Sequence, residues 1–563
     1  MVSSSGDRPC PRIAVFAGPT ATVLNSHPLV TSGKARRRHG LPALPAGEPD
    51  ALRPQRLALP VTVYVEQFSA HPLERDAAEL HAAPDAWVTP DGSVLDAPSS
   101  PEDRPVHRID LDPADGLYPL PYMGRQADGT AWEADAARPE DPAAGWRQPF
   151  HPDSSRVFEE IDRLMVDGAG HAGRLQRLAT YDHHRAAPSG GWTRGLPEAD
   201  RTDIGTGDVA PEVVGVDFFP YRPASLRREP LRATLADLTN RVQEALGEGT
   251  YDGALWLEGS PYVEETAYWL NLLIDTTRPI AATSGSIGPA GAENVIDAAT
   301  YVVSGIWADD AGADRVGVVC VHDEQVLTAR EVQKSDDRPG GFTATGGHGG
   351  VVATMGKPGP PVATFVPVRR HTSTSEVRLT ALPDETTGLV RTDAGALRPA
   401  QVRVRSDAGR LLAEAVPAVH VIKHVRYQQA DADSDDRAEL ELFERARREL
   451  DTPGLVGFVI EAGTPYGDTT RPLEQGLARM IMSGVPVVKV GRGDVGGFVP
   501  HERVPLGIAG GNLTATKARV LLMACLLRFG ALRPAQDPLA PTAVEEEAVR
   551  AMLARYQTVF DSH

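Results

Sequence analysis

The sequence predicts an α/β protein whose strands lie mostly parallel in sheets that are layered with helices. Short apolar runs at 251–257, 279–283 and 315–321 alternate with stretches whose apolar residues recur at helical spacing, at 231–246 and 263–274. Such alternation is typical of helices that cover a mostly parallel sheet. The 563 residues exceed what one small core needs, and 41% hydrophobic with 24% charged residues is a globular composition. We therefore expect two or more compact units.

The first expected element is a buried strand at 12–17, an apolar run that ends at Gly18-Pro19. From about residue 36 to residue 211 the chain becomes dense in Pro, Gly, Asp and Ala. A strand expected at 59–65 and an amphipathic helix expected at 155–165 interrupt this composition. We therefore predict that 36–211 is a large, loop-rich insertion with some structure of its own.

Regular alternation returns after Val213. We expect a strand at 213–218 and a helix over 231–246 that stops at Gly247, followed by the strands and the helix named above. The Gly- and Pro-rich passage 339–361 is predicted to be one long loop.

A second series of strands and helices begins near Pro417, with strands expected at 456–461 and 485–490 and a helix at 516–525. The acidic run 430–436 precedes a helix expected at 439–450. Carboxylates suit a helix N-terminus, and a metal site at this run is the alternative. The sequence therefore predicts two α/β units, at 10–395, including the insertion, and at 415–563.

Charge and cysteine content argue against several classes of function. The chain has 57 Lys and Arg against 76 Asp and Glu, a net charge of −19. Such a surface repels phosphate backbones and anionic lipid, so we expect no nucleic-acid partner and no membrane. No apolar run approaches the roughly 20 residues of a membrane span. Three dispersed cysteines favour a reducing cytoplasm. Without an HExxH motif or a glycine-rich phosphate loop after a strand, we predict no metal and no cofactor.

Three loops are placed where chemistry is expected in an open parallel sheet, after the carboxyl ends of strands. They are Ala17–Thr20, Glu258–Ala267 and Arg330–Asp337. Thr20, Ser260 and Lys334 supply two hydroxyls and an amine that suit nucleophilic acyl chemistry. Each residue alone has an ordinary alternative, because a threonine in a turn often caps a helix and a lysine on a loop is usually solvated.

These loops, in this order, resemble the two threonine-bearing motifs and the lysine motif of the bacterial-type asparaginase/glutaminase family. The matching segments are Ala17-Gly18-Pro19-Thr20-Ala21, Glu258-Gly259-Ser260-Pro261-Tyr262-Val263-Glu264-Glu265-Thr266-Ala267 and Glu331-Val332-Gln333-Lys334. Residues 369–373 and 511–521 resemble the domain junction and the final helix of the family. The resemblance covers about 10–35, 213–380 and 415–535.

The resemblance implies an amidase of two α/β domains that carries its active site on the N-terminal domain. In the family a neighbouring subunit completes the site, so a homodimer or homotetramer with shared active sites is implied. By carry-over, Thr20 is the nucleophile that forms the acyl-enzyme, Ser260 takes the second hydroxyl position and Lys334 activates it. Backbone N–H groups near Gly259 and Ser260 are expected to stabilise the oxyanion.

The sequence departs from the family's pattern at the substrate-binding positions. Pro261 replaces the aspartate that pairs with the substrate's α-ammonium, and Glu258 occupies a histidine position. Of the Ser-Gln pair that holds the head group, Ser225 is kept and Leu226 replaces the glutamine. The insertion could supply replacement contacts. The candidates are polar residues that we expect in a loop, namely His183, His184, Arg185 and the neighbourhood of Trp192.

Three functions stay open on these residues. The first is a cytoplasmic amidohydrolase that acts on a small-molecule amide other than free asparagine, because an α-ammonium without its carboxylate would be an unpaired charge. The second is a scaffold that has lost hydrolysis and binds a ligand or a partner. The third is acyl transfer to an amine at the same site.

Overall fold

Several of the predicted elements lie in parts of the chain that the structure does not describe. The computed structural model describes residues 11–18, 52–56, 61–65, 85–89, 93–111, 117–121, 175, 178–184, 232–247, 249–284, 289–336, 340–345, 350–357, 359–393, 395–424, 442, 444–446, 448–463, 466–492 and 498–563. The helix expected at 155–165, the strand expected at 213–218 and the acidic run 430–436 lie outside these residues.

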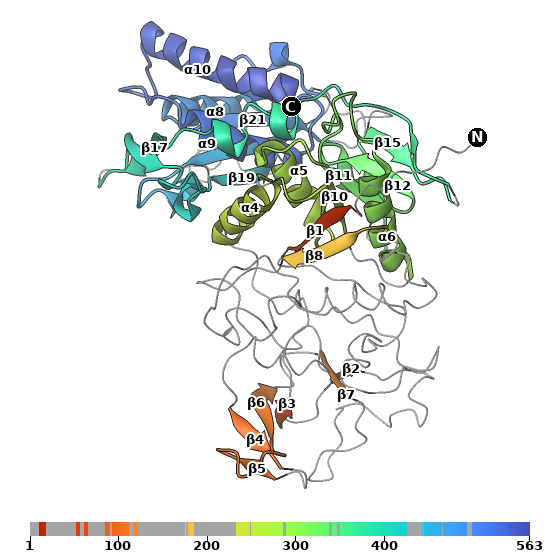
Figure 1. Cartoon of the computed structure of the whole chain (residues 1–563). Coiled ribbons are helices and arrows are strands. Elements are labelled where there is room, and N and C mark those ends of the chain that lie inside the picture. Colours follow the sequence, from red (N-terminus) through yellow and green to blue (C-terminus); the bar gives the residue numbers. More distant parts are fainter. Residues whose placement is uncertain are drawn as a thin grey trace, which may run out of the picture.

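Eight strands form the larger sheet, in the order β16-β15-β12-β11-β10-β9-β1-β8. Strands β8, β1, β9, β10 and β11 run parallel, while β12, β15 and β16 are antiparallel to their neighbours. Figure 1 shows β1 and β8 side by side. The bounds are β1 Arg12–Ala17, β8 Thr180–His184, β9 Gly253–Leu257, β10 Ile280–Thr283, β11 Val319–His322, β12 Gln325–Thr328, β15 Val351–Thr354 and β16 Val362–Ala363.

Helices cover both faces of this sheet, because successive strand residues point to opposite sides. Phe16 and Trp256 join the buried cluster that includes α4 (Arg232–Gly247) and α5 (Val263–Leu273). Val15 and Leu255 join the cluster beneath α6 (Pro289–Ser304). The result is three layers, a mostly parallel sheet between two layers of helices, which confirms the predicted α/β class.

A second, smaller sheet is entirely parallel, in the order β19-β20-β21-β22. Helix α9 packs against β19 and β20 and also against α5 of the larger sheet. Buried apolar side chains of both sheets therefore form one continuous cluster. The bounds are β19 Ala418–Lys423, β20 Val456–Ala462, α8 Arg471–Met482, β21 Val487–Gly491, β22 Ile508–Ala509, α9 Ala515–Phe529 and α10 Ala543–Ser562.

The remaining described elements are short. Two-stranded sheets pair β13 with β14, β17 with β18, and β2 with β7, and a four-stranded sheet has the order β3-β6-β4-β5. Their bounds are β2 Leu52–Arg56, β3 Val61–Val65, β4 Ala86–Val88, β5 Val94–Leu95, β6 Arg104–Leu111, β7 Leu117–Pro121, β13 Val332–Lys334, β14 Phe342–Ala344, β17 Glu385–Arg391 and β18 Leu397–Arg403, and the 3₁₀ turns are η8 Thr372–Thr374, η9 Leu379–Ala381, η10 Ala413–Ala415 and η11 His501–Arg503.

Two local predictions are wrong. The passage 339–361 is not one long loop, because it contains β14 and β15. Both are short runs between glycines, and their antiparallel pairing with β13 and β12 outweighs the loop-like composition. His183 and His184 do not lie in a loop, since they belong to β8 and pair with Val15 and Phe16 of β1. The strand expected from residue 315 also begins later, at Val319.

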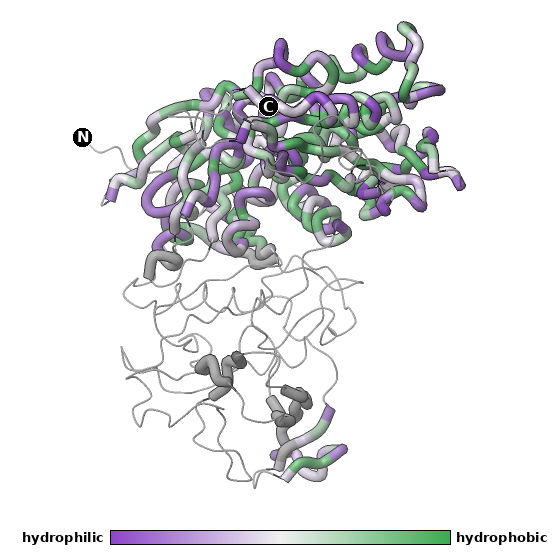
Figure 2. The backbone as a smooth tube through the Cα atoms, turned by 180° about the vertical axis from the view of Figure 1, so that it is seen from behind, coloured by the Kyte–Doolittle hydropathy of each residue, from purple (hydrophilic) through white to green (hydrophobic). Residues whose placement is uncertain are grey.

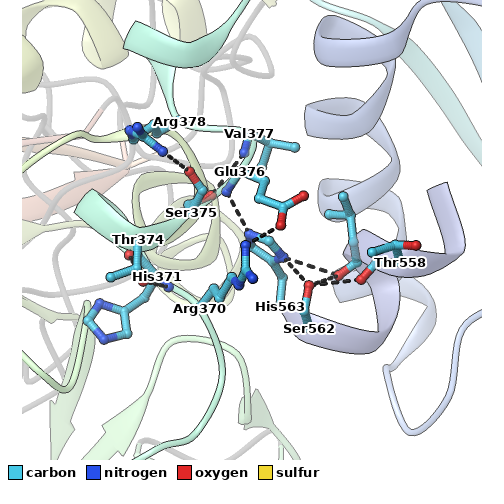
Figure 3. A network of polar contacts seen from close by, with 11 residues as sticks. Arg370, His371, Thr374, Ser375, Glu376, Val377, Arg378, Thr558, Ser562 and His563 are labelled. Atoms are coloured by element: carbon cyan, nitrogen blue, oxygen red, sulfur yellow. Dashed lines mark hydrogen bonds and ion pairs between the residues drawn. The ribbon is translucent and has the colours of Figure 1, made fainter. Parts of the chain in front are cut away.

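The apolar segments around the larger and the smaller sheet lie mostly inside the protein, where Figure 2 shows much of the backbone in green. Polar contacts reinforce the packing where α10 meets the segment 370–378 (Figure 3). There the Glu376 N–H donates to His563 Nε2 at 3.0 Å, and the Arg370 N–H donates to the Ser562 carbonyl at 2.9 Å. Within the described ranges, no helix has both the length and the apolar character needed to cross a membrane.

Candidate active site

Four polar or glycine positions meet at the carboxyl edge of the larger sheet. Strands β1, β9, β10 and β11 are adjacent and parallel, so the residues that end or follow them lie along one edge. These residues are Gly18, Glu258, Ser284 and His322. This edge is where ligands bind in open α/β sheets, and two of the three predicted loops start from it.

Gly18, which follows β1, is joined to the end of β9, where the next loop begins. The Gly18 N–H donates to the Leu257 carbonyl at 2.8 Å. Glu258 is buried, its Oε2 accepts from the Trp256 indole N–H at 3.0 Å, and its own N–H donates to the Thr283 carbonyl at 3.1 Å. The Glu258 carboxylate is thus held at the strand ends, directly beside the backbone of Gly18.

The loop 258–262 exposes one hydroxyl and then opens α5. Gly259 is buried, Ser260 and Pro261 are exposed, and the peptide between these two is cis. The Val263 N–H donates to the Gly259 carbonyl at 3.2 Å, which starts the helix. Within the described residues, the N–H groups of Gly259 and Ser260 have no hydrogen-bond acceptor. As far as the described part of the chain goes, two donors therefore lie next to the Ser260 side chain without an acceptor.

Lys334 is the last residue of β13 and does not lie on a loop as predicted. Its N–H donates to Glu264 Oε2 at 2.5 Å, and its ammonium donates to the Gly340 carbonyl. Glu264 lies in the first turn of α5, four residues after Ser260. Burial raises the pKa of the Glu264 carboxyl, while Lys517 acts in the opposite direction. The strand that carries Lys334 is therefore tied to the helix that follows Ser260.

A buried lysine of helix α9 holds the same two elements. Lys517, in the first turn of α9, is 1% exposed and donates to the Glu264 carbonyl at 2.5 Å and to the Ala329 carbonyl at 2.6 Å. Burial lowers the pKa of Lys517 to about 8, and Glu264 opposes this shift. Because α9 also packs against the smaller sheet, Lys517 links that sheet to the helix that follows the Ser260 loop.

The structure places some predicted site residues and leaves others outside its limits. Glu258, Gly259, Ser260 and Pro261 lie together on the loop before α5, and Lys334 is linked to them through Glu264. Thr20 and Ser225 lie outside the described residues. No cluster of three or more His, Cys, Asp or Glu side chains that could hold a metal ion occurs in the described part.

Sequence reasoning did not identify four polar groups at this site. Ser284 and His322 could have been found, because each is the polar residue that closes an apolar strand run. Glu264 and Lys517 carry no such local signal, since their contact joins residues 253 positions apart.

A cavity of about 440 Å³ adjoins the loop before α5. Glu258, Tyr262 and Thr266 line it from the loop and α5, and α4 and α9 provide walls of both apolar and polar side chains. The apolar side chains that line the cavity are Leu235 and Leu238 of α4, Trp269 of α5, Val421 of β19, and Val520 and Met523 of α9. Its charged lining groups include Arg232, Glu265 and Arg519.

Comparison with known proteins points to one family. Residues 231–351 match the family model "Asparaginase, N-terminal". An L-asparaginase of Bacillus licheniformis is 30% identical over 131 residues, which are 22% of this chain and 38% of that protein. A glutaminase-asparaginase of Pseudomonas fluorescens biotype A is 24% identical over 304 residues, 52% of this chain and 69% of that protein.

A probable cytoplasmic L-asparaginase of Campylobacter jejuni has a solved structure that superposes with a TM-score of 0.45 at 19% identity, over 72% of this chain and 91% of that one. The alignment with the Bacillus licheniformis protein spans little more than a third of that relative's length. The matched segment 231–351 contains the loop before α5, Glu264 and Lys334. The chain is thus similar to asparaginases, most clearly over residues 231–351 and more distantly over about half of its length.

Proposed function

We propose that the chain is an amidohydrolase that cleaves a carboxamide through a threonine acyl-enzyme, with Thr20 as the nucleophile. The observation that carries this proposal is the junction of β1 and β9. Because the Gly18 N–H bonds to the Leu257 carbonyl at 2.8 Å, Gly18, two residues before Thr20, lies beside the start of the loop that bears Ser260. Two hydroxyls from separate loops at one sheet edge suit acyl transfer.

Lys334 and the N–H groups of the loop complete the proposed machinery. The Glu264 carboxylate holds the main chain of Lys334 at 2.5 Å, which fixes the lysine relative to α5 and to the Ser260 loop. The Lys334 ammonium can donate one of its protons toward the leaving nitrogen and take one back from the Ser260 hydroxyl. We assign the stabilisation of the oxyanion to the N–H groups of Gly259 and Ser260, because neither has an acceptor within the described ranges.

The proposed reaction has two balanced steps. In the first, the Thr20 hydroxyl oxygen bonds to the carboxamide carbon, its proton passes by way of Ser260 and Lys334 to the leaving nitrogen, and ammonia departs. In the second, water attacks the acyl-threonine ester, the C–O bond to Thr20 breaks, and the hydroxyl regains its proton. The products are a carboxylate and ammonium.

The substrate that we propose is a small-molecule amide without a free α-amino acid head. Pro261 supplies no carboxylate for an α-ammonium, and Glu258 is already engaged by the Trp256 indole at 3.0 Å. A cationic head group brought there without a partner would be costly. The cavity of about 440 Å³ beside Glu258 and Tyr262 is large enough for a substituent on such a substrate.

We further propose the organisation that the resemblance implies. The domains are 10–395 and 415–563, Ser225 contributes to substrate binding, and the protein works in the cytoplasm as a homodimer or homotetramer with shared sites. Size-exclusion chromatography with light scattering tests the oligomer, and a monomer that hydrolyses amides at full rate would contradict the sharing of sites.

The test of the function is ammonia release from asparagine, glutamine, N-acylated amides and peptide amides. Wild type is compared with Thr20→Ala, Lys334→Met and the control Lys423→Met, whose side chain is 66% exposed on β19. We expect one masked amide to be hydrolysed. Thr20→Ala and Lys334→Met should each lower kcat by about 10³-fold or more, because removing one member of a catalytic unit already abolishes most of the rate. Lys423→Met should keep the wild-type rate.

Two outcomes would contradict the proposal. If no amide in the panel releases ammonia, hydrolysis is not the function, and ligand binding by the same panel should then be measured calorimetrically. If an amide is hydrolysed equally by wild type and Thr20→Ala, the acyl-threonine mechanism is wrong.

A further inference from the structure

His322 ends β11, at the same sheet edge as the candidate active site. The ring is 2% exposed, and both of its nitrogens meet polar groups. Ser284 Oγ lies 2.8 Å from Nε2, and Asn294 Nδ2 lies 3.2 Å from Nδ1. Burial lowers the pKa of His322 to about 3, and the charge of Lys334 acts in the same direction. The imidazole is therefore neutral near pH 7 and anchored at both nitrogens.

The face of the imidazole supports Phe342 of β14. The two rings are stacked, with centroids 4.3 Å apart and an interplanar angle of 24°. Phe342 is the direct cross-strand partner of Lys334 in the pairing of β13 with β14. The Lys334 ammonium lies over the Phe342 ring, 5.3 Å from its centroid. One phenyl ring thus touches both the anchored histidine and the lysine of the proposed mechanism.

A second route leads from the same end of β11 to the lysine. The Lys334 ammonium donates to the Gly340 carbonyl. Gly340 packs on Asp323, the residue after His322, so closely that an added Cβ would stand 2.6 Å from Asp323 Oδ2. Asn294 joins both residues, because its Oδ1 accepts from the Asp323 N–H at 3.1 Å while its Nδ2 faces His322.

We propose that His322 is a positioning residue for Lys334, acting through the Phe342 ring. The inference deepens the proposed function and rests on it, because the role of Lys334 as proton carrier is part of that proposal. Ser284 is 1% exposed, so a substrate does not reach the Ser284–His322 pair in this structure. The pair supports the lysine and is not itself a nucleophile with its base.

The physical basis is rigid support without added charge. A neutral ring packs against Phe342 and leaves the Lys334 ammonium as the one cation of this cluster of His322, Phe342 and Lys334. Loss of the ring opens space behind Phe342, and the ammonium then occupies a wider range of positions. Misplacement of a catalytic group by about 1 Å can cost a hundredfold in rate, so a modest loosening is measurable.

The first test does not need activity. Trace acetylation with acetic anhydride, followed by peptide mass spectrometry, gives the labelling rate of Lys334 relative to that of Lys423 on the same chain. We compare wild type with His322→Ala, with His322→Gln, which keeps a polar group but no ring, and with His322→Phe, which keeps a ring. The control is His420→Ala, because His420 also packs on a phenylalanine, Phe458 at 5.7 Å, but in the smaller sheet.

We expect the Lys334 to Lys423 ratio to rise about threefold or more in His322→Ala and His322→Gln. It should stay within about twofold of wild type in His322→Phe and His420→Ala, since a ring still supports Phe342 in both. Folding of each variant is verified by its urea unfolding transition. An unchanged ratio in a folded His322→Gln protein overturns the proposal, and a ratio raised equally by His420→Ala would show a general loosening instead.

The second test uses the amide identified in the hydrolysis panel. His322→Gln should lower kcat by about tenfold with KM within about twofold of wild type, and His322→Phe should recover most of that loss. If wild type hydrolyses no amide, the proposed function fails, and the labelling ratio alone decides the role of His322. If hydrolysis requires Lys334 but folded His322→Gln has wild-type kcat and labelling, only the present inference fails.

Discussion

The carboxylate of Glu258 lies directly against the backbone of Gly18. A Cβ built on Gly18 would stand 2.8 Å from Glu258 Cδ, 2.9 Å from its Oε1 and 3.0 Å from Trp256 Cζ2. A contact under 3 Å requires something to move. Gly18 is therefore needed for space, and its neighbour Glu258 cannot keep its position if any side chain is added there.

Gly18→Ala should displace Glu258 and shift the backbone of residue 18 itself. Overpacking of this kind costs about 1–3 kcal/mol in the free energy of unfolding. Because the proposed nucleophile lies two residues further on, we also expect kcat to fall by about tenfold or more. Urea unfolding and ammonia release measure the two effects.

The matched control is Gly247→Ala at the end of α4, where the nearest atom, Gln243 Nε2, is 3.7 Å from the added Cβ. This substitution should leave activity unchanged and alter stability by less than about 1 kcal/mol, because alanine favours the helix. Wild-type stability and wild-type kcat in Gly18→Ala would show that the close approach does not constrain the site.

Local apolar patterns were sufficient to predict the main elements of both sheets. The runs 12–17, 251–257 and 456–461 became the buried strands β1, β9 and β20, and the helix expected at 231–246 became α4. Strands β14 and β15 were missed because each is a short run in a glycine-rich passage, and their stability comes from pairing with β13 and β12. Strands of three or four residues that depend on their pairing partners leave no periodic signal in the sequence.

The candidate site was predictable only in part for a similar reason. Ser260 and Lys334 belong to motifs that resemble a known family, and the rule that loops at the carboxyl edge carry chemistry placed the loop of Ser260 correctly. The contact of Lys517 with Glu264 bridges both units of the fold, so neither residue differs locally from an ordinary helix lysine or glutamate. Only the packing of α9 on α5 reveals it.

Lys517→Met should weaken both the fold and the site. The methionine keeps the apolar stem but removes the charged donor from the buried Glu264 and Ala329 carbonyls. Losing hydrogen bonds from a charged group at buried acceptors costs about 2–4 kcal/mol in the free energy of unfolding. We also expect kcat to decrease, because α5 and the segment before β13 lose their common anchor.

Lys423→Met serves as the control, since its side chain is 66% exposed and its ion pair with Glu461 spans 3.4 Å. Exposed pairs contribute little, so the unfolding transition should move by less than about 1 kcal/mol. Equal urea midpoints for Lys517→Met and Lys423→Met would mean that Lys517 does not join the two units energetically.

Two buried histidines should make the fold sensitive to mild acid. Burial lowers the pKa of His322 to about 3 and that of His563 to about 4, with nearby positive charges acting in the same direction. An unfolded histidine titrates near pH 6.5, so the unfolded chain takes up protons first as the pH falls. The stabilisation is complete above about pH 6.5 and is lost progressively toward pH 4 for His563 and toward pH 3 for His322.

The free energy of unfolding from urea titrations at pH 7, 6, 5.5 and 5 measures this loss. Each fully buried histidine contributes a slope of up to about 1.4 kcal/mol per pH unit below pH 6. His563→Gln removes one titrating group while an amide oxygen can still accept from the Glu376 N–H, as His563 Nε2 does at 3.0 Å (Figure 3). The variant should therefore show a slope that is shallower by about 1.4 kcal/mol per pH unit. Identical slopes in wild type and His563→Gln would show that His563 is protonated as easily in the folded chain as in the unfolded one.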